Sequence, residues 1–274
     1  MKAFKAGVVA IVGLPNAGKS TLTNALAGLK ISIVTPKPQT TRSRIQAVIT
    51  RDDAQVVLVD TPGLTRGHDA LRRALYQTAA HAARESDVAL LLVEVSGGAP
   101  LEATAREALD VARQGGRPVV VALNKIDKLA RKEVLLPWIA AYAALPGVAA
   151  VVPISALRAD GLQELVDEIV TRLPESPPLF PPDTVTDQIE RVLCAELVRE
   201  QLYLQLHQEL PYSSAVVIDE FEDGRPSGLC RLAGRIVVER ESQKGIVVGK
   251  GGKQIKAVSE RARAEIEKLL GARV

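Results

Sequence analysis

Glycine, lysine and serine residues near the N-terminus have the spacing of a phosphate-binding loop. Residues 13–20 read GLPNAGKS, which fits the pattern G-x-x-x-x-G-K-[ST] between an apolar run and a helical pattern. Glycines let successive backbone N–H groups turn toward phosphate oxygens, and the start of the following helix adds its positive end. We expect Lys19 to reach the β- and γ-phosphates of a nucleotide and the Ser20 hydroxyl to bind Mg²⁺. The residues predicted to bind phosphate are Gly13, Asn16, Ala17, Gly18, Lys19, Ser20 and Thr21.

A second short motif follows the apolar run 56–59. It reads Asp60-Thr61-Pro62-Gly63 and fits the pattern D-x-x-G. A carboxylate at a strand end beside the phosphate loop suits a water-mediated contact with Mg²⁺, and the Gly63 N–H is placed to sense a γ-phosphate. Alone the motif is weak, because Asp and Gly are typical of any turn. The switch segment predicted here comprises Asp60, Thr61, Pro62, Gly63 and Leu64.

The tetrapeptide Asn124-Lys125-Ile126-Asp127 ends the apolar run 119–123 and is the most informative of the three motifs. The Asp127 carboxylate can accept two hydrogen bonds, from the N1–H and N2–H₂ donors of guanine. Adenine offers neither donor there, and a polar site built for donors rejects an analogue that lacks them. The motif therefore predicts a guanine nucleotide. The predicted guanine-binding residues are Asn124, Lys125 and Asp127, with Ser155, Ala156 and Leu157 supporting the base.

Strand and helix patterns alternate over the first 173 residues and must position these motifs. Several strands are continuous Val, Leu and Ala runs, which are typical of strands buried on both faces. The alternation predicts an α/β domain with a doubly wound, mostly parallel sheet. The expected strands are residues 8–12, 44–50, 55–59, 88–95, 118–123 and 148–154, and the expected helices are 19–27, 69–85, 101–114, 131–145 and 161–173.

Five prolines in the nine residues 174–182 interrupt this pattern. Proline cannot continue a helix or enter a central strand, so the stretch is interpreted as a semi-rigid linker between domains. The patterns that follow it are a helix at 184–210, strands at 214–221 and 229–239, and helices at 244–248 and 254–270. We therefore expect an α/β domain at 1–173, a linker at 174–182 and an α+β domain at 183–274.

The loop before the last predicted helix is rich in glycine and lysine. Residues 249–252 read Gly-Lys-Gly-Gly, and the order helix, strand, strand, helix, loop, helix resembles a type II KH domain. In such domains a G-x-x-G loop clamps about four nucleotides by their backbones. Residues 225–274 carry 12 Lys+Arg against 5 Asp+Glu, which is as typical of a solvated helix as of a polyanion-binding surface. The resemblance implies RNA contacts by Ile246, Val247, Gly249, Lys250, Gly251, Gly252, Lys253 and Lys256.

The nucleotide motifs, in this order, resemble those of translation-factor-like GTPases of the Ras-type P-loop class. The stretch Pro38-Gln39-Thr40-Thr41-Arg42 resembles switch I of the Era family, which implies that Gln39 and Thr40 belong to the switch and that Thr41 contacts Mg²⁺. A GTPase domain, a short linker and a KH domain resemble the Era family over essentially the whole chain. That resemblance implies a bacterial protein that hydrolyses GTP, binds 16S rRNA near its 3′ end and assists assembly of the 30S ribosomal subunit. It also implies that the GTP or GDP state controls RNA binding through the switch loops.

Two features of the sequence depart from these family patterns, and the role of a third, Asn16, has two possible interpretations. A type II KH domain has a third strand after its last helix, and we expect this domain to lack that strand and the tail beyond it, because the sequence stops at Val274. Leu64 stands where Ras-type enzymes carry the Gln that orients the attacking water, so intrinsic hydrolysis should be slow. In related GTPases an Asn of the phosphate loop binds K⁺ through its carbonyl. Asn16 is therefore either a K⁺ ligand or a plain turn residue.

Composition excludes several other classes of protein. The 274 residues are 47% hydrophobic and 24% charged, which is ordinary for a globular protein and excludes wholesale disorder. Two cysteines cannot make a disulfide framework or a zinc site, and no apolar run is long enough for a membrane span or a secretory signal. We expect a cytoplasmic monomer, and the family resemblance adds peripheral association with the inner face of the cell membrane.

Three alternative functions remain open at this point. One is an assembly factor that uses GTP occupancy only as a signal, and another is a related GTPase that acts on tRNA modification or on the large subunit. The third is a small-molecule kinase, which would leave Asn124 and Asp127 without a role.

Overall fold

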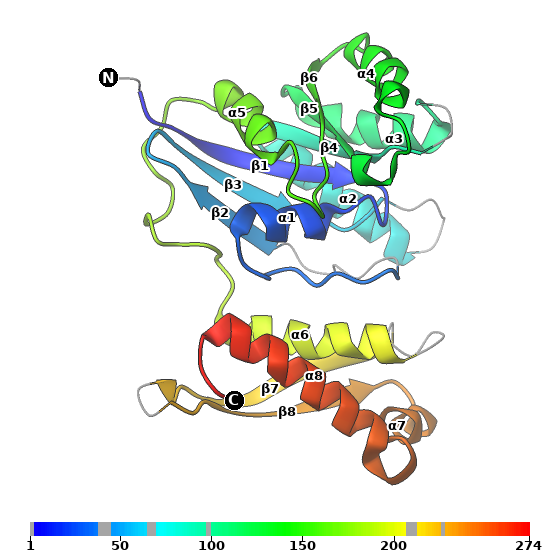
Figure 1. Ribbon diagram of the computed structural model, residues 1–274, viewed down its shortest axis with the longest axis vertical. Coiled ribbons are helices and arrows are strands. Elements are labelled where there is room, and N and C mark those ends of the chain that lie inside the picture. Colours follow the sequence, from blue (N-terminus) through cyan, green and yellow to red (C-terminus); the bar gives the residue numbers. More distant parts are fainter. Residues whose placement is uncertain (1–2, 38–44, 65–69, 97–99, 207–212, 226–227) are drawn as a thin grey trace. The chain divides into compact units, whose positions relative to one another are not determined.

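A six-stranded sheet forms the centre of the first part of the chain (Figure 1). The computed structural model describes residues 3–37, 45–64, 70–96, 100–206, 213–225 and 228–274. The strand order is β2-β3-β1-β4-β5-β6, with β2 antiparallel to β3 and all other neighbours parallel, so the predicted doubly wound, mostly parallel sheet is confirmed. The strands are β1 (Lys5–Gly13), β2 (Ile45–Thr50), β3 (Ala54–Asp60), β4 (Val88–Glu94), β5 (Val119–Asn124) and β6 (Val148–Pro153).

Helices cover both faces of this sheet. Alanine and leucine side chains of α2 and α3, together with Trp138 and Tyr142 of α4, pack in one core cluster with Leu91 and Val121 of the strands. Figure 1 shows α1 and α5 on the other face. Parallel strands place their carboxyl ends at one edge, which brings the motifs after β1, β3 and β5 together. The helices are α1 (Lys19–Ala27), α2 (Ala70–Glu85), α3 (Ala103–Ala112), α4 (Leu135–Ala143) and α5 (Leu162–Arg172).

The proline-rich stretch is attached to the sheet by the buried side chain of Gln55. The Gln55 Oε1 atom accepts hydrogen bonds from the backbone N–H groups of Leu179 at 2.7 Å and Phe180 at 2.8 Å. Its Nε2 donates to the Phe180 carbonyl at 3.0 Å. Because both the oxygen and the nitrogen of the Gln55 amide form hydrogen bonds with this stretch, the proline-rich stretch follows the surface of the α/β unit.

The first helix of the second unit begins later than the periodicity predicted. Helix α6 spans Glu190–Gln205, whereas the pattern suggested 184–210, of which 207–210 lie outside the described residues. The Thr186 hydroxyl donates to the Gln46 carbonyl of β2 at 2.7 Å, so the preceding residues extend along a sheet edge instead of coiling. The chain divides into two compact units after Asp187.

The second unit consists of Gln188–Val274 together with a short segment that begins at Ser32. Helices α6 and α8 pack on the antiparallel pair β7–β8 around Cys194, Leu197, Ala262 and Ile266. In the described part of this unit the sheet has two strands, with one isolated parallel bridge between Leu229 and Arg273. Its elements after α6 are β7 (Ser214–Glu222), β8 (Arg231–Val238), α7 (Glu241–Val248), the 3₁₀ turn Lys250–Gly252 and α8 (Lys253–Leu270). None of the helices in the described ranges combines the length and the hydropathy that crossing a bilayer requires.

Candidate functional site

The phosphate loop wraps around the side chain of its own lysine. The Lys19 Nζ atom donates to the carbonyls of Gly13 at 3.2 Å and Leu14 at 3.0 Å, and the residue is buried. Burial lowers the pKa of Lys19 to about 8, and the negative charge of Asp60 opposes part of that shift. A cation is thus held inside the loop, where a bound phosphate would meet it.

Asn124 links the phosphate loop to the loop after β6. Its Nδ2 donates to the Ala17 carbonyl at 2.8 Å, and its Oδ1 accepts the Ala156 N–H at 3.0 Å. The Asn124 side chain is almost completely buried. Both ends of one amide therefore hold together three segments that lie far apart in the sequence.

The Asp127 carboxylate is oriented by a neighbouring hydroxyl. Ser155 Oγ donates to Asp127 Oδ1 at 2.6 Å and accepts the Arg158 N–H at 3.1 Å. Asp127 is exposed, and Leu157 beside Ser155 is 73% exposed. The carboxylate is therefore held in place but open to a base, and Leu157 adds apolar surface next to it.

Two of the residues expected to hold Mg²⁺ lie in direct contact. Ser20 Oγ donates to Asp60 Oδ2 at 2.9 Å, and the Asp60 side chain is fully buried at the end of β3. A hydroxyl and a carboxylate are the hard oxygen donors that Mg²⁺ prefers, so these residues fit the ion. Thr41, the third predicted ligand, lies outside the described residues, as do Gln39 and Thr40.

The D-x-x-G segment lies directly against the phosphate loop. A Cβ at Gly63 would come within 2.9 Å of the Pro15 Cα, and the Leu64 N–H donates to the Gly13 carbonyl at 3.1 Å. The Leu64 side chain is buried in a core cluster with Val12. Its position therefore provides no polar group to a water molecule. Of the other residues in these two loops, Asn16 is exposed with a φ of +61°, Thr21 is half-buried in α1, and Thr61 and Pro62 are buried.

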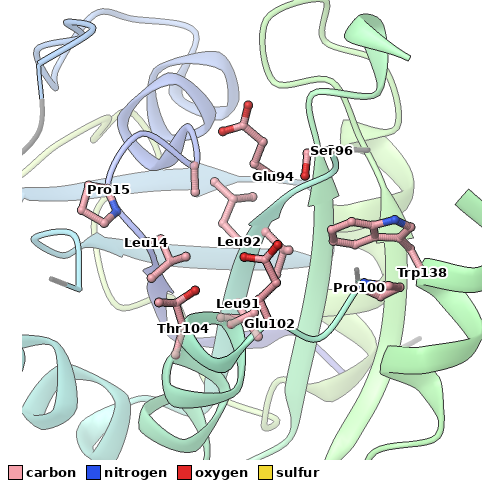
Figure 2. A pocket seen from close by; sticks show the side chains of 14 residues that line it. Leu14, Pro15, Leu91, Leu92, Glu94, Ser96, Pro100, Glu102, Thr104 and Trp138 are labelled. Carbon is pink, nitrogen blue, oxygen red and sulfur yellow. The ribbon is translucent and has the colours of Figure 1, made fainter. Parts of the chain in front are cut away.

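A cavity of about 120 Å³ lies behind the phosphate loop (Figure 2). Leu14 and Pro15 of the loop, Leu92 of β4 and Trp138 of α4 are among the side chains that line it. Leu14 and Pro15 of the phosphate loop therefore border this cavity instead of packing fully against other side chains. The carbonyls of Gly13 and Leu14 accept hydrogen bonds from Lys19, and the Ala17 carbonyl accepts one from Asn124.

The Gly-Lys-Gly-Gly turn of the second unit is a tight glycine-rich turn surrounded by exposed lysine side chains. Gly249 has a φ of +71°, and a Cβ there would lie 2.6 Å from the Cβ of Gln254, so this position requires glycine. The three lysines of the predicted RNA site are exposed, as is Ile246 at 59%. Val247 corrects the expectation, because its side chain is 4% exposed and packs with Leu202 and Val258 in the core. The exposed lysines are Lys250, Lys253 and Lys256, and Gly251 and Gly252 complete the turn.

Sequence reasoning missed one charged residue at the nucleotide motifs, Glu94. It ends β4, and its carboxylate lies 2.6 Å from the Lys125 Nζ. The available signal was a lone charge within the otherwise apolar run 88–95. The pairing itself depends on β4 and β5 being neighbours in the sheet, which the local pattern does not reveal.

The fold and this arrangement of loops define a P-loop GTPase domain followed by a KH domain. A family model described as "50S ribosome-binding GTPase" matches residues 8–125, and one described as "KH domain" matches residues 209–274. GTPase Era of Syntrophus aciditrophicus (strain SB) is 44% identical over 271 residues, 99% of this chain and 88% of that protein. GTPase Era of Stenotrophomonas maltophilia (strain K279a) is 46% identical over 273 residues, 98% of this chain and 89% of that protein. The chain belongs to the Era family of GTPases.

Two solved structures match this fold over both units. A crystal structure of Era in complex with MgGDPNP and nucleotides 1506–1542 of 16S ribosomal RNA has a TM-score of 0.90 and 39% sequence identity, covering 99% of this chain and 91% of that chain. A crystal structure of a single-residue variant of Aquifex aeolicus Era bound to GDP.AlF4- has a TM-score of 0.91 with the same identity and coverage.

Proposed function

We propose that this chain binds GTP and GDP with Mg²⁺, hydrolyses GTP, and binds 16S rRNA near its 3′ end during assembly of the 30S subunit. The single observation that carries the nucleotide part is the Asn124 amide, which joins the phosphate loop to the loop after β6. The RNA part is supported by the exposed lysines around Gly249 and by the relative solved with MgGDPNP and nucleotides 1506–1542 of 16S rRNA. In this proposal the nucleotide state controls RNA binding through the switch loops.

The residues of the nucleotide site have separate roles in this proposal. Lys19 binds the β- and γ-phosphates and offsets charge that develops on the transferred group. Asp127 accepts the guanine donors, and Ser155 keeps its carboxylate in the accepting orientation. Ser20, Thr41 and Asp60 hold Mg²⁺, which supplies positive charge to the phosphate oxygens when bound. Hydrolysis is the in-line attack of water on the γ-phosphate.

Further parts of the proposal rest on the resemblance. Asn16 is proposed as a K⁺ ligand, and its exposed position on the phosphate loop is compatible with that role. We also propose a cytoplasmic monomer with peripheral association at the inner face of the membrane.

The experiment that tests the guanine site is Asp127→Asn. The amide would place a donor against the guanine donors, whereas xanthine offers a carbonyl at one of those positions. GTP affinity should fall by about 2–4 kcal/mol, and xanthosine triphosphate should become the preferred ligand. Calorimetric titration of both nucleotides measures this exchange. Unchanged GTP affinity would show that another residue recognises the base.

A further inference from the structure

Two lysines share the Glu94 carboxylate unequally. Lys125 Nζ lies 2.6 Å from Glu94 Oε2, whereas Lys128 Nζ lies 3.5 Å from Glu94 Oε1. The Lys125 side chain is 20% exposed and the Lys128 side chain 61%. The closer ion pair is therefore also the one less screened by water and salt.

Strand pairing fixes this arrangement. In the parallel ladder of β4 and β5, Glu94 pairs with Asn124, so it lies one strand spacing from the start of the guanine motif. Lys125 has a φ of +68°, a left-handed conformation that few non-glycine residues adopt. Figure 2 shows Glu94 at the end of β4 with its carboxylate pointing away from the cavity behind the phosphate loop.

The polar end of the Lys125 side chain bonds a different part of the sheet from those of Asn124 and Asp127. Asn124 bonds the phosphate loop and the loop after β6, and Asp127 is bonded by Ser155. Lys125 instead reaches across to β4. A lysine held by its ammonium group presents four methylene groups along its length, and such stems cover apolar, planar surfaces while the charge stays paired.

We propose that Glu94 is a positioning residue of the guanine site, which holds the ammonium group of Lys125 so that the stem of that side chain lies against the face of the bound purine. The inference rests on the proposed guanine-nucleotide site. A lysine that is already held loses little rotamer freedom when the nucleotide binds, so the pair preorganises the site. Removing the carboxylate should act mainly by speeding nucleotide dissociation.

A double-mutant cycle on Glu94 and Lys125 tests this role, with the full chain, GDP and Mg²⁺. Calorimetry gives the Kd and stopped-flow fluorescence gives the dissociation rate. Glu94→Gln should raise the Kd for GDP about three- to tenfold, as expected for losing a partly shielded ion pair. Lys125→Ala should raise it at least as much, and adding Glu94→Gln to Lys125→Ala should change nothing further.

The matched control is Lys128→Ala, which removes the other lysine from the same carboxylate. Its Kd should stay within about twofold of the wild-type value, because that pair is long and exposed. Glu94→Asp keeps the charge but shortens the reach, so it should also weaken GDP binding. It provides the comparison should Glu94→Gln unfold below the assay temperature.

Two results would overturn the proposal. One is an equal effect of Glu94→Gln in the wild-type and Lys125→Ala backgrounds, which would show that Glu94 does not act through Lys125. The other is wild-type GDP binding by both Glu94 variants. Failure of the guanine site itself has a different signature, because Asp127→Asn would then bind GDP as the wild type does.

Discussion

The side-chain amide of Asn124 fills the space in which a Cβ at Gly18 would have to lie. Such a Cβ would be 2.4 Å from Asn124 Nδ2, the atom that donates to the Ala17 carbonyl. Gly18 also has a φ of +101°, which L side chains rarely adopt. Glycine is therefore required here by the backbone of the phosphate loop and again by the guanine motif that packs on it.

Gly18→Ala should weaken GDP binding at least tenfold, because the added methyl group displaces Asn124 from the phosphate loop. The variant should also lose about 1–3 kcal/mol of unfolding free energy through backbone strain. Calorimetry with GDP and denaturant unfolding measure the two effects.

Gly28→Ala is the matched control for this change. Gly28 also has a positive φ, of +66°, but no atom lies within 4 Å of a Cβ placed there. It should lose about 1–2 kcal/mol of stability and keep its GDP affinity. Equal losses of affinity in the two variants would mean that strain alone, and not the contact with Asn124, weakens binding.

Replacing Lys250 and Gly251 together with Asp should abolish RNA binding and leave GDP binding intact. Both positions are exposed in the Gly-Lys-Gly-Gly turn, so two carboxylates would face the phosphates of the RNA. A filter-binding titration with a 16S rRNA 3′-end fragment measures the loss. Binding by the unchanged protein should also weaken as salt rises, as contacts dominated by phosphates do.

The control for that variant is Lys268→Asp, in the last turn of α8, where Lys268 pairs with Glu265 at 2.8 Å. It changes the net charge by −2, as Lys250→Asp does by itself, and should retain most RNA binding. RNA retention by the Lys250 and Gly251 double variant at low salt would place the RNA interface elsewhere.

Hydrolysis should be faster in K⁺ than in Na⁺ at equal ionic strength, and Asn16→Ala should remove the difference. Leu64 is buried and apolar, so extra positive charge near the β–γ bridge would compensate for the missing polar side chain. Single-turnover phosphate release in the two salts measures the effect. Equal rates would contradict the role of Asn16 and favour an activator supplied by the ribosome.

Tyr142→Phe should stabilise the α/β unit by about 1 kcal/mol at neutral pH. The Tyr142 hydroxyl is buried and has no hydrogen-bond partner among the residues that the structure describes, so removing it removes a desolvation penalty. Burial, and then the charge of Glu102, raise the pKa of Tyr142 to about 12. Because the unfolded group titrates near 10, the folded state binds the proton more tightly.

That shift also predicts a pH dependence for the same residue. Below pH 10 the Tyr142 hydroxyl is protonated in both the folded and the unfolded state. As the pH rises from 10 toward 12 the unfolded state releases this proton first, so the wild type should lose about 2–3 kcal/mol of stability in all. Denaturant unfolding at several pH values should therefore show a shallower decline for Tyr142→Phe than for the wild type. Tyr76→Phe is the control for the stability effect, because the Tyr76 hydroxyl accepts a hydrogen bond from Gln114, and this variant should not stabilise the protein.

Local patterns predicted most of the elements and motifs. Helix α1 has the bounds that its pattern indicated, and the strands of the α/β unit differ from their predicted ranges by a few residues at the ends. The start of α6 was wrong by six residues, because residues before it are bonded to the edge of β2. Val247 was expected at the RNA surface but packs inward. Successive residues of a helix point in different directions around its axis, and the sequence alone does not show which side of this helix faces the core.

The sequence by itself determined the chemistry of this protein, because each motif carries its residue types at short, fixed spacings within one loop. Gly18, Lys19 and Ser20 need only their neighbours to form a phosphate loop. The tertiary structure alone decided which distant side chains meet, such as Asn124 with Ala17 and Glu94 with Lys125. Those contacts depend on the order of strands in the sheet, and local periodicity reports which residues are buried but not which strands become neighbours.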